Sequence, residues 1–551
     1  MGKVFEIFDK DLMGRVGVIH THHGIVRTPE LAPVINPVKN IVPVKKVIDV
    51  GFQLIMTNAY IIKRHYNSLA LKLGVHKLLG YEGPIMTDSG AYQLMEYRSI
   101  DVSPIEIVRY QEMLGADIGV ILDIPTRYRV PKRVVIEEVK ETVKRAKEAL
   151  RVVKQGNMIL VAPVQGGIYL DLVKWSAKEL SELDFEMYGI GGPTQMMEQY
   201  KYDELVDLIA TAKSYLPPEK PVHLFGAGNP LTLSLAVALG VDTFDSASYA
   251  IYARDLRYML PDGVIRIERL RDLPCLCPVC RNYDIETFTS LPRHELEQEI
   301  ALHNLYVIKM ELKRIRQAIA EGTLWELLEI RARSHPSLMQ GLRRLKKYIR
   351  LLERSDPVTK PIVRGIFFYP QTSTFRPEVY RHRVRIINSY IPPKCKYLLL
   401  LPETLERPFS RYGPISLLYS SLRELIETSL IHIVVYSVPF GVIPIELDEI
   451  YPLSQYEYSG NPTWKERHNV AKFIIKYLAT FKQYYEKIII HTDVRRWGIK
   501  FYEFLYKELT RLVRRENILL TPIGSDDPYD SLAIEELLAT IKHNTTYSQS
   551  S

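Results

Sequence analysis

The feature that most constrains the fold of this 551-residue chain is a series of eight short apolar segments in its first half. Each segment is nearly continuous in apolar residues, and a stretch with helix-forming character follows it. Strands that are buried on both faces have this composition, and strand–helix alternation is typical of parallel sheets covered by helices. The predicted strands are residues 32–35, 52–57, 83–87, 117–123, 158–164, 186–190, 221–225 and 241–244.

Eight such units predict an α/β fold with a (β/α)8 barrel of the TIM type, and an open doubly wound sheet is the alternative. Helix-start signals between the strands support this alternation. Residues 103–106 form a capping box with proline at the first helical position, and residues 132–152 are charged and helically periodic.

A change of pattern after the barrel predicts the domain organisation. A long helical tract occupies residues 292–352, and Ser355-Asp356-Pro357 then interrupts it. We therefore predict a first domain over residues 1–355, which contains the barrel. Residues 356–551 then form a C-terminal α+β extension, built as one domain or as two small ones.

Charge and cysteine content narrow the class of protein. The net charge of +8 is compatible with a polyanionic partner. Three of the four cysteines lie within six residues, which is unlike a disulfide framework and favours a reducing, cytoplasmic setting. The chain shows no signal-peptide pattern, and its most apolar stretch, residues 430–445, is too short to span a bilayer. We expect a cytoplasmic protein with no membrane segment.

The working residues of a (β/α)8 barrel lie just after the carboxyl ends of its strands. A single aspartate at the end of a strand is more simply explained as a cap of the next helix. Three aspartates at one end of a barrel favour a functional site instead. The strand ends supply three carboxylates, an amide, two glycines and an aromatic ring: Asp88, Asp123, Asp245, Gln165, Gly191, Gly192 and Phe225.

These residue types suit chemistry on a nucleobase. One carboxylate can attack an anomeric carbon, and a second can move the proton of a leaving or entering base. The third, together with Gln165 and the glycine backbone, can bind a purine edge, and Tyr92 or Phe225 can stack on the purine face. Such a pocket fits a flipped-out base.

Six motifs at these strand ends resemble those of the tRNA-guanine transglycosylases. The segment MTDSGAYQ at residues 86–93 is similar to the TDSGGFQ-type signature of that family. The segment FDSASY at residues 244–249 resembles the archaeal form of the motif with the second catalytic aspartate. Between them, LDIP, VQGG, GIGGP and FGAG follow in the order of the family. The resemblance covers roughly residues 10–345.

The resemblance implies a pentosyltransferase that replaces guanine 15 in the D-arm of tRNA with 7-cyano-7-deazaguanine (preQ0), a step of archaeosine biosynthesis. Asp245 would attack the ribose and form a covalent intermediate, with Asp88 as general acid and base. The reverse assignment is also attached to this family, and the sequence leaves both open. A homodimer is the family expectation. The residues that would bind the base are Ser89, Tyr92, Asp123, Gln165, Gly191, Gly192 and Phe225.

One departure from the bacterial pattern bears on the substrate. Pro193 stands where leucine is usual in the bacterial enzymes. Proline has no N–H to donate, which fits a ligand that lacks the aminomethyl group of the bacterial substrate. We therefore expect preQ0 and guanine as the small-molecule substrates, and tRNA as the macromolecular one.

A cysteine cluster predicts a metal site. Cys275, Cys277 and Cys280 supply three soft ligands from one loop, which indicates zinc in an insertion at about residues 270–310. The residues available as a fourth ligand are His294, His303 and Cys395. The two histidines would face opposite sides of a helix, and only His303 lies on its apolar stripe. The resembled family binds zinc through three cysteines and one histidine at this spacing. The resemblance therefore implies His303 as the fourth ligand and one structural Zn2+ per chain.

The C-terminal extension resembles the additional domains of the archaeal enzymes at residues 439–441 and 451–455, but no PUA module is recognisable. Two other functions compete with base exchange. One is a non-catalytic tRNA-binding partner subunit of the same family, and the presence of both Asp88 and Asp245 disfavours it. The other is a zinc-dependent hydrolase on the same barrel, which a thiolate-rich closed metal site disfavours.

Overall fold

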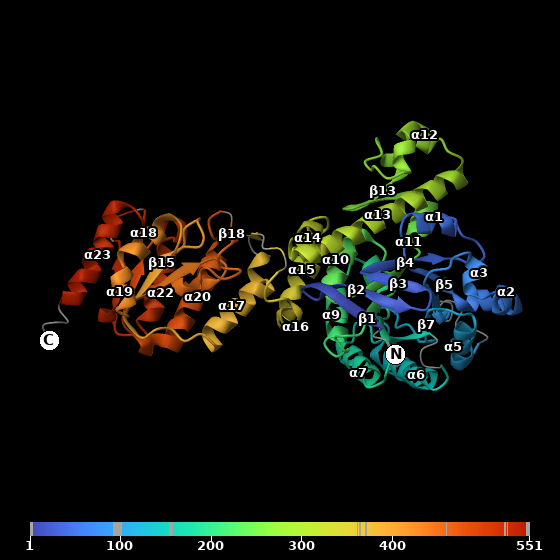
Figure 1. The fold of residues 1–551 in the computed structure, drawn as a ribbon, viewed down its shortest axis with the longest axis horizontal. Coiled ribbons are helices and arrows are strands. Elements are labelled where there is room, and N and C mark those ends of the chain that lie inside the picture. The colour runs from blue at the N-terminus through green and yellow to red at the C-terminus, as the bar shows by residue number, and fades with distance from the viewer. Residues whose placement is uncertain are drawn as a thin grey trace. The chain divides into compact units, whose positions relative to one another are not determined.

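The computed structural model describes residues 4–91, 102–153, 158–360, 362, 365–369, 372–458, 460–522, 525 and 527–546. The chain divides into two compact units, Met1–Ile362 and Val363–Ser551 (Figure 1). The first unit extends past residue 355 because buried side chains there contact its N-terminal strands. Asp356 accepts a hydrogen bond from the backbone N–H of Leu12 at 3.0 Å, and Lys360 pairs with Asp11.

The first unit contains a closed barrel of eight parallel strands, and pairing of β11 with β4 completes the ring. Each predicted segment contributes one strand, so the barrel is confirmed and the open sheet is excluded. The strands are β4 (Glu30–Ile35), β5 (Ile55–Asn58), β6 (Ile85–Asp88), β7 (Ile118–Val120), β8 (Ile159–Val164), β9 (Met187–Ile190), β10 (Val222–Leu224) and β11 (Thr243–Ser246).

Helices follow the strands around the outside of the barrel. The predicted capping box is present, because Ser103 and Glu106 each accept a hydrogen bond from the other's backbone N–H. The helices include α2 (Ala59–Leu73), α5 (Pro104–Met113), α6 (Lys132–Leu150), α7 (Leu170–Ser181), α9 (Tyr202–Lys213), α10 (Pro230–Ala238) and α11 (Ser248–Arg254).

A three-stranded antiparallel sheet precedes the barrel, and the apolar pattern did not predict it. Its strands are β1 (Phe5–Asp11), β2 (Gly14–Thr21) and β3 (Gly24–Thr28). Side chains from all three strands join one apolar cluster with the first residues of β7, β8 and β9. This sheet therefore covers the amino-terminal end of the barrel, opposite the strand ends that carry the candidate site.

The long helical tract after the barrel is confirmed as several helices. A short hairpin and α12 (Ile285–Thr289) lie near the start of α13 (Arg293–Glu321), which Gly322 ends in a left-handed conformation (Figure 1). The remaining elements of the tract and its preceding hairpin are β12 (Arg257–Leu260), β13 (Gly263–Arg266), α14 (Leu324–Ala332), α15 (Pro336–Arg344) and α16 (Ile349–Ser355).

The second unit is an α/β structure around a five-stranded sheet of order β17-β16-β15-β19-β20, in which β17 is antiparallel to its neighbour. One apolar core extends through it from Ile366 to Ile541. Among the described residues, no helix combines the length and apolar composition needed to cross a membrane. The main elements are β15 (Cys395–Pro402), β16 (Ile431–Ser437), β17 (Gly441–Pro444), β19 (Tyr485–His491), β20 (Ile518–Thr521), α17 (Pro377–Asn388), α18 (Gly413–Ser421), α20 (Trp464–Phe481), α22 (Ile499–Leu509) and α23 (Ser531–Thr546).

The buried ion pair between α13 and α14 gives a test of this packing. Arg331 binds Glu311 through two hydrogen bonds of 2.8 and 2.6 Å, and both side chains are buried. Arg331→Met would leave the Glu311 carboxylate buried without its partner, which should lower the free energy of unfolding by about 3 to 5 kcal/mol. Calorimetry on the intact chain would measure the loss.

A matched control is Lys140→Met, which removes an exposed pair with Glu137. Exposed pairs contribute at most about 1 kcal/mol. Equal stability of the two variants would contradict the importance of the buried pair.

Candidate active site

The carboxyl ends of the barrel strands bring polar side chains together at one rim, which we call the mouth. Asp88 ends β6 and Asp245 lies near the end of β11, while Asp123 and Gln165 follow β7 and β8. The glycine pair follows β9, and Phe225 follows β10. Tyr92 lies outside the described residues. Every other strand-end residue predicted from the sequence is therefore at this rim.

Asp88 has the properties of a proton carrier. Burial raises its pKa to about 7, and the neighbouring charges of Asp123 and Asp245 act in the same direction. Its side chain remains partly exposed, so a ligand in the mouth can reach it. Asn58, at the end of β5, donates a hydrogen bond from Nδ2 to Oδ2 of Asp88 at 2.7 Å. A carboxyl group with a pKa near 7 can both give and take a proton at neutral pH.

Asp245 is held differently. Its Oδ1 accepts hydrogen bonds from the backbone N–H of Gly226 at 2.8 Å and from Nε2 of His223 at 3.0 Å. The carboxylate is 13% exposed. Both donors hold the same oxygen of the Asp245 carboxylate, whereas the Asp88 side chain accepts a hydrogen bond from Asn58.

Asp123 and Gln165 form a rigid pair. Burial raises the pKa of Asp123 to about 6, and the hydrogen bond from Gln165 opposes that rise. Nε2 of Gln165 donates to Oδ2 of Asp123 at 2.5 Å, and its Oε1 accepts the N–H of Thr126 at 3.0 Å. The second contact fixes which end of the amide faces Asp123. Among the described residues, no side chain donates a hydrogen bond to Oδ1 of Asp123.

The two glycines after β9 make room for this pair. A Cβ atom on Gly191 would lie 2.0 Å from Nε2 of Gln165, and one on Gly192 would lie 2.7 Å from the carbonyl oxygen of Thr126. The N–H of Gly191 donates to Val164, so this group is already used within the barrel. Glycine at these positions therefore permits the close approach of the Gln165 amide.

Ser89 and Phe225 support the mouth from either side. Ser89 is buried, and its hydroxyl donates to the carbonyl oxygen of Ile121 at 3.0 Å, which ties the end of β6 to β7. Phe225 is partly exposed and packs over Gly189, where a Cβ atom would lie 2.5 Å from the ring. Phe225 also packs against the apolar cluster of the barrel, so it lies between that cluster and the mouth.

The strand-end analysis missed two residues of this site. Asn58 is one position beyond the predicted strand 52–57, so the same strand-end rule could have found it. His223 lies within the predicted strand 221–225. Its only signal in the sequence is that it is a polar residue within an apolar run.

The predicted metal ligands also lie together. Sγ of Cys275, Cys277 and Cys280 and Nδ1 of His303 are all within 4.8 Å of one another. Nδ1 of His303 is 3.5 Å from Sγ of Cys277 and 3.3 Å from Sγ of Cys280. These separations fit the edges of a tetrahedron around an ion with bonds of about 2.0 to 2.3 Å.

The surroundings of His303 favour ligation through Nδ1. Its Nε2 is 2.9 Å from the carbonyl oxygen of Met259, which accepts the ring N–H and leaves Nδ1 unprotonated. The ring of Tyr258 stacks on it at 3.6 Å. His294 is 82% exposed, and Cys395 belongs to the second unit. The cluster of Cys275, Cys277, Cys280 and His303 can therefore hold a metal ion.

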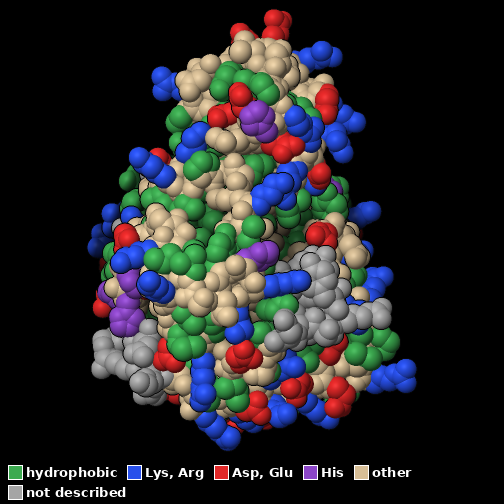
Figure 2. Space-filling view, turned by 90° about the vertical axis from the view of Figure 1, so that its right-hand side faces the viewer, with side chains coloured by type: hydrophobic (Ala, Val, Ile, Leu, Met, Phe, Trp, Pro, Cys, Tyr) green, Lys and Arg blue, Asp and Glu red, His purple; other side chains and the backbone are tan. Residues whose placement is uncertain are grey.

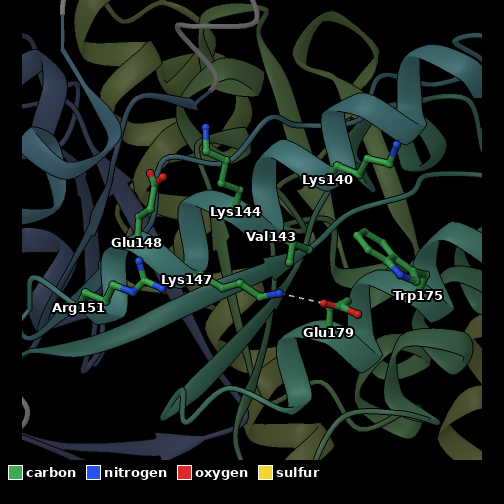
Figure 3. Close-up of a pocket in the computed structure, with 8 residues that line it drawn as sticks. All are labelled: Lys140, Val143, Lys144, Lys147, Glu148, Arg151, Trp175 and Glu179. Carbon is green, nitrogen blue, oxygen red and sulfur yellow. Dashed lines mark hydrogen bonds and ion pairs between the residues drawn. The ribbon is translucent and has the colours of Figure 1, made fainter.

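A pocket of about 310 Å3 lies between α6 and α7, where Lys147 pairs with Glu179 at 3.0 Å (Figure 3). It includes none of the strand-end residues. On the face shown in Figure 2, Lys and Arg side chains are spread among acidic and apolar ones.

A cluster of carboxylates at the carboxyl end of a closed parallel barrel is the arrangement of the (β/α)8 enzymes. Residues 10–337 match the family model for queuine tRNA-ribosyltransferase, and the chain belongs to this family. It is therefore a pentosyltransferase, and the resemblance found in the sequence motifs is confirmed. Residues 379–533 match a domain of unknown function (DUF5591).

Curated relatives agree with this family. Each of the following is called tRNA-guanine(15) transglycosylase. The protein of Pyrobaculum aerophilum is 44% identical over 83% of this chain and 90% of its own length. That of Aeropyrum pernix is 48% identical over 69% of this chain and 74% of its own. That of Methanobrevibacter smithii is 41% identical over 89% of this chain and 74% of its own.

The metal cluster gives a direct prediction. Cys277→Ser and His303→Ala each remove one ligand, so the metal content of the purified protein should fall well below one ion per chain. Elemental analysis would measure it, and the melting temperature should fall with it. Cys395→Ser is the matched control, because that buried thiol lies in the second unit and should leave metal content unchanged. Unchanged metal content in Cys277→Ser would contradict the ligand set.

Proposed function

We propose that this chain exchanges guanine 15 in the D-arm of tRNA for preQ0, in archaeosine biosynthesis, through a covalent aspartyl-ribose intermediate. The observation that carries the mechanism is the pairing of an Asp88 carboxyl whose pKa is about 7 with a hydrogen-bonded Asp245 carboxylate in the same mouth. The assignment of the substrates is based on the family of the chain and on the name of its relatives. The net charge of +8 suits an RNA partner.

The exchange requires a nucleophile and one group that acts first as acid and then as base. A carboxylate oxygen of Asp245 attacks C1′ of the target nucleotide, and the bond from C1′ to N9 of guanine breaks. Its electron pair goes to the base, which takes a proton from Asp88. The entering preQ0 then gives its N9 proton to Asp88, N9 attacks C1′, and the Asp245 carboxylate leaves.

This division of roles follows from the surroundings of the two groups. Asp88 with a pKa of about 7 exists in both protonation states near neutral pH, as the acid–base role demands. Asp245 receives two hydrogen bonds that hold its carboxylate in one orientation, which suits a nucleophile. Of the two assignments left open by the sequence, the geometry favours Asp245 as the nucleophile.

The base is proposed to bind between Phe225 and Tyr92, with Asp123 at its edge. Oδ1 of Asp123, beside the oxygen held by Gln165, would accept hydrogen bonds from the N1–H and exocyclic amine of guanine or preQ0. Adenine presents an acceptor in place of that N1–H and would leave the buried carboxylate facing a lone pair. The backbone of Gly192 completes the proposed contacts with the base. Ser89 is buried and donates its hydroxyl to Ile121, and Gly191 donates its N–H to Val164, so these two residues are proposed to shape the mouth.

We assign zinc to the Cys3His cluster and a structural role to the ion. Three thiolates and one imidazole complete a tetrahedron, which leaves no coordination position for water or substrate. When bound, the ion supplies stability to the insertion. This donor set disfavours the zinc-dependent hydrolase. A homodimer and a cytoplasmic location complete the proposal, and light scattering would test the dimer.

Incorporation of labelled guanine into tRNA tests the function. The wild type should label tRNA, whereas a non-catalytic partner subunit would not. Asp245→Ala should abolish both the exchange and the protein–RNA adduct on denaturing gels, with thermal melts as the folding control. An adduct that persists in Asp245→Ala and disappears in Asp88→Ala would reverse the two roles.

The rate of guanine exchange should be highest near pH 7, because Asp88 lacks a proton to donate well above this value and cannot accept one well below it.

Asp123→Asn tests base selection. Because Thr126 fixes the Gln165 amide, the new side chain should turn its oxygen toward Nε2 of Gln165 and its NH2 group toward the base. A donor would then face the N1–H and the amine of the purine, so incorporation of guanine and preQ0 should fall by at least 100-fold, on the order of two unmatched hydrogen bonds. Asp123→Ala should lose less, since it introduces no opposing donor. Near-normal guanine kinetics in Asp123→Asn would move base recognition to Gln165 and the glycine pair.

A further inference from the structure

We infer that His223 is a positioning residue for Asp245 and that it selects Oδ2 of Asp245 as the attacking atom. This inference rests on the proposed function, in which Asp245 is the nucleophile. His223 lies in β10 with its side chain fully buried, and β10 pairs with β11, the strand that carries Asp245. Neither the strand-end rule nor the family motifs singled out this residue.

Strand pairing places the histidine between two partners. His223 is the register partner of Thr243, and Asp245 lies two residues further along β11, on the same face as Thr243. The imidazole bridges both side chains. Its Nδ1 is 2.9 Å from Oγ1 of Thr243, and its Nε2 is 3.0 Å from Oδ1 of Asp245.

These partners define the direction of the hydrogen bonds. A carboxylate can only accept, so Nε2 of His223 carries the hydrogen that faces Asp245. In the neutral ring Nδ1 is then an acceptor, and the hydroxyl of Thr243 donates to it. Thr243 thus holds the tautomer that presents a donor to the nucleophile, as outer partners do for histidines at metal and catalytic sites.

A second donor reaches the same oxygen of Asp245. The N–H of Gly226 donates to Oδ1 at 2.8 Å from a turn in which Gly226 has a φ of +68°. A Cβ atom there would lie 2.6 Å from Oγ1 of Thr194, so the turn requires glycine. Among the described residues, no hydrogen bond to Oδ2 is present. The carboxylate is therefore asymmetric, with one oxygen held by two donors and the other open.

This asymmetry has consequences for both halves of the exchange. The hydrogen-bonded Oδ1 is the weaker nucleophile because its donors stabilise its charge, so Oδ2 forms the bond to C1′ as the bond from C1′ to N9 breaks. Oδ1 then becomes the carbonyl oxygen of the ester. When N9 of the entering base attacks C1′, the bond between Oδ2 and C1′ breaks, and the two donors stabilise the carboxylate that leaves.

The competing interpretation is that His223 is only a hydrogen-bonded core residue. The chain offers a matched comparison in His491, a buried histidine of the second unit. Its Nδ1 is 2.9 Å from Oγ1 of Thr521 on the neighbouring strand, but its Nε2 contacts the backbone carbonyl of Pro528 instead of a carboxylate. His491→Leu therefore reproduces the loss of a buried imidazole without touching the mouth.

The experiment compares His223→Leu, His223→Gln, Thr243→Val and His491→Leu in the full chain, with guanine exchange into tRNA. His223→Leu should lower kcat on the order of 100-fold, as removal of one preorganised donor does, while KM for tRNA stays near the wild-type value. Formation and breakdown of the adduct should both slow. His223→Gln, which can place an amide N–H near the position of Nε2, should recover most of kcat. Thr243→Val should lower kcat less. Without the threonine hydroxyl, the imidazole can also adopt the tautomer that presents no hydrogen to Asp245, but the donating tautomer remains accessible.

His491→Leu should lose stability without a change in kcat. If His223→Leu and Thr243→Val keep wild-type kcat, the inference is overturned, while the proposed function stands as long as Asp245→Ala is inactive. If His223→Leu does not fold, Thr243→Val and His223→Gln decide the question through the ratio of kcat to KM. A wild type that labels no tRNA would instead overturn the proposed function itself.

Discussion

The pairing of β11 with β4 is the contact on which the arrangement of the mouth depends. It joins Asp245, from the last strand of the barrel, to the first strand, and so closes the ring that brings Asp245 near Asp88. Glu30, at the start of β4, is paired in register with Thr243 and is fully buried. A carboxylate in such a place needs a cation, and Lys309 of α13 supplies one at 2.6 Å.

The helix α13 therefore connects the pairing of β11 with β4, which we call the seam, to the Cys3His cluster. His303 lies near the middle of α13 and completes the Cys3His set, and Lys309 contacts the seam within two further turns. Asn304, next to the metal ligand, accepts the N–H of Met259 and so fixes β12 to the same helix. An ion bound by the Cys3His cluster would therefore order both the insertion and the helix that neutralises Glu30, without contacting the mouth.

The sequence predicted the features that follow from local pattern. Nearly continuous apolar runs marked the barrel strands, and strand-end position alone placed Asp88, Asp123, Gln165 and Asp245 at one rim. It did not predict β1 to β3. In β1 buried residues are interspersed with exposed ones, so this strand lacks the continuous apolar signal. Nor could it predict His223, since its role depends on the register of β10 against β11. Register between distant strands is a property of barrel closure, which no short segment encodes.

The same closure gives the two aspartates of one mouth different hydrogen-bond partners. Burial and negative neighbours both favour the protonated form of Asp88. At Asp88 those effects prevail, and its pKa rises to about 7. At Asp245, β10 contributes two donors from outside its own strand, the imidazole of His223 and the N–H of Gly226. Asp88 has an amide from β5 and its local backbone, but no imidazole donor among the described residues. The difference in hydrogen-bond partners thus follows from which strand lies beside each aspartate, and the roles proposed for the two groups rest on it.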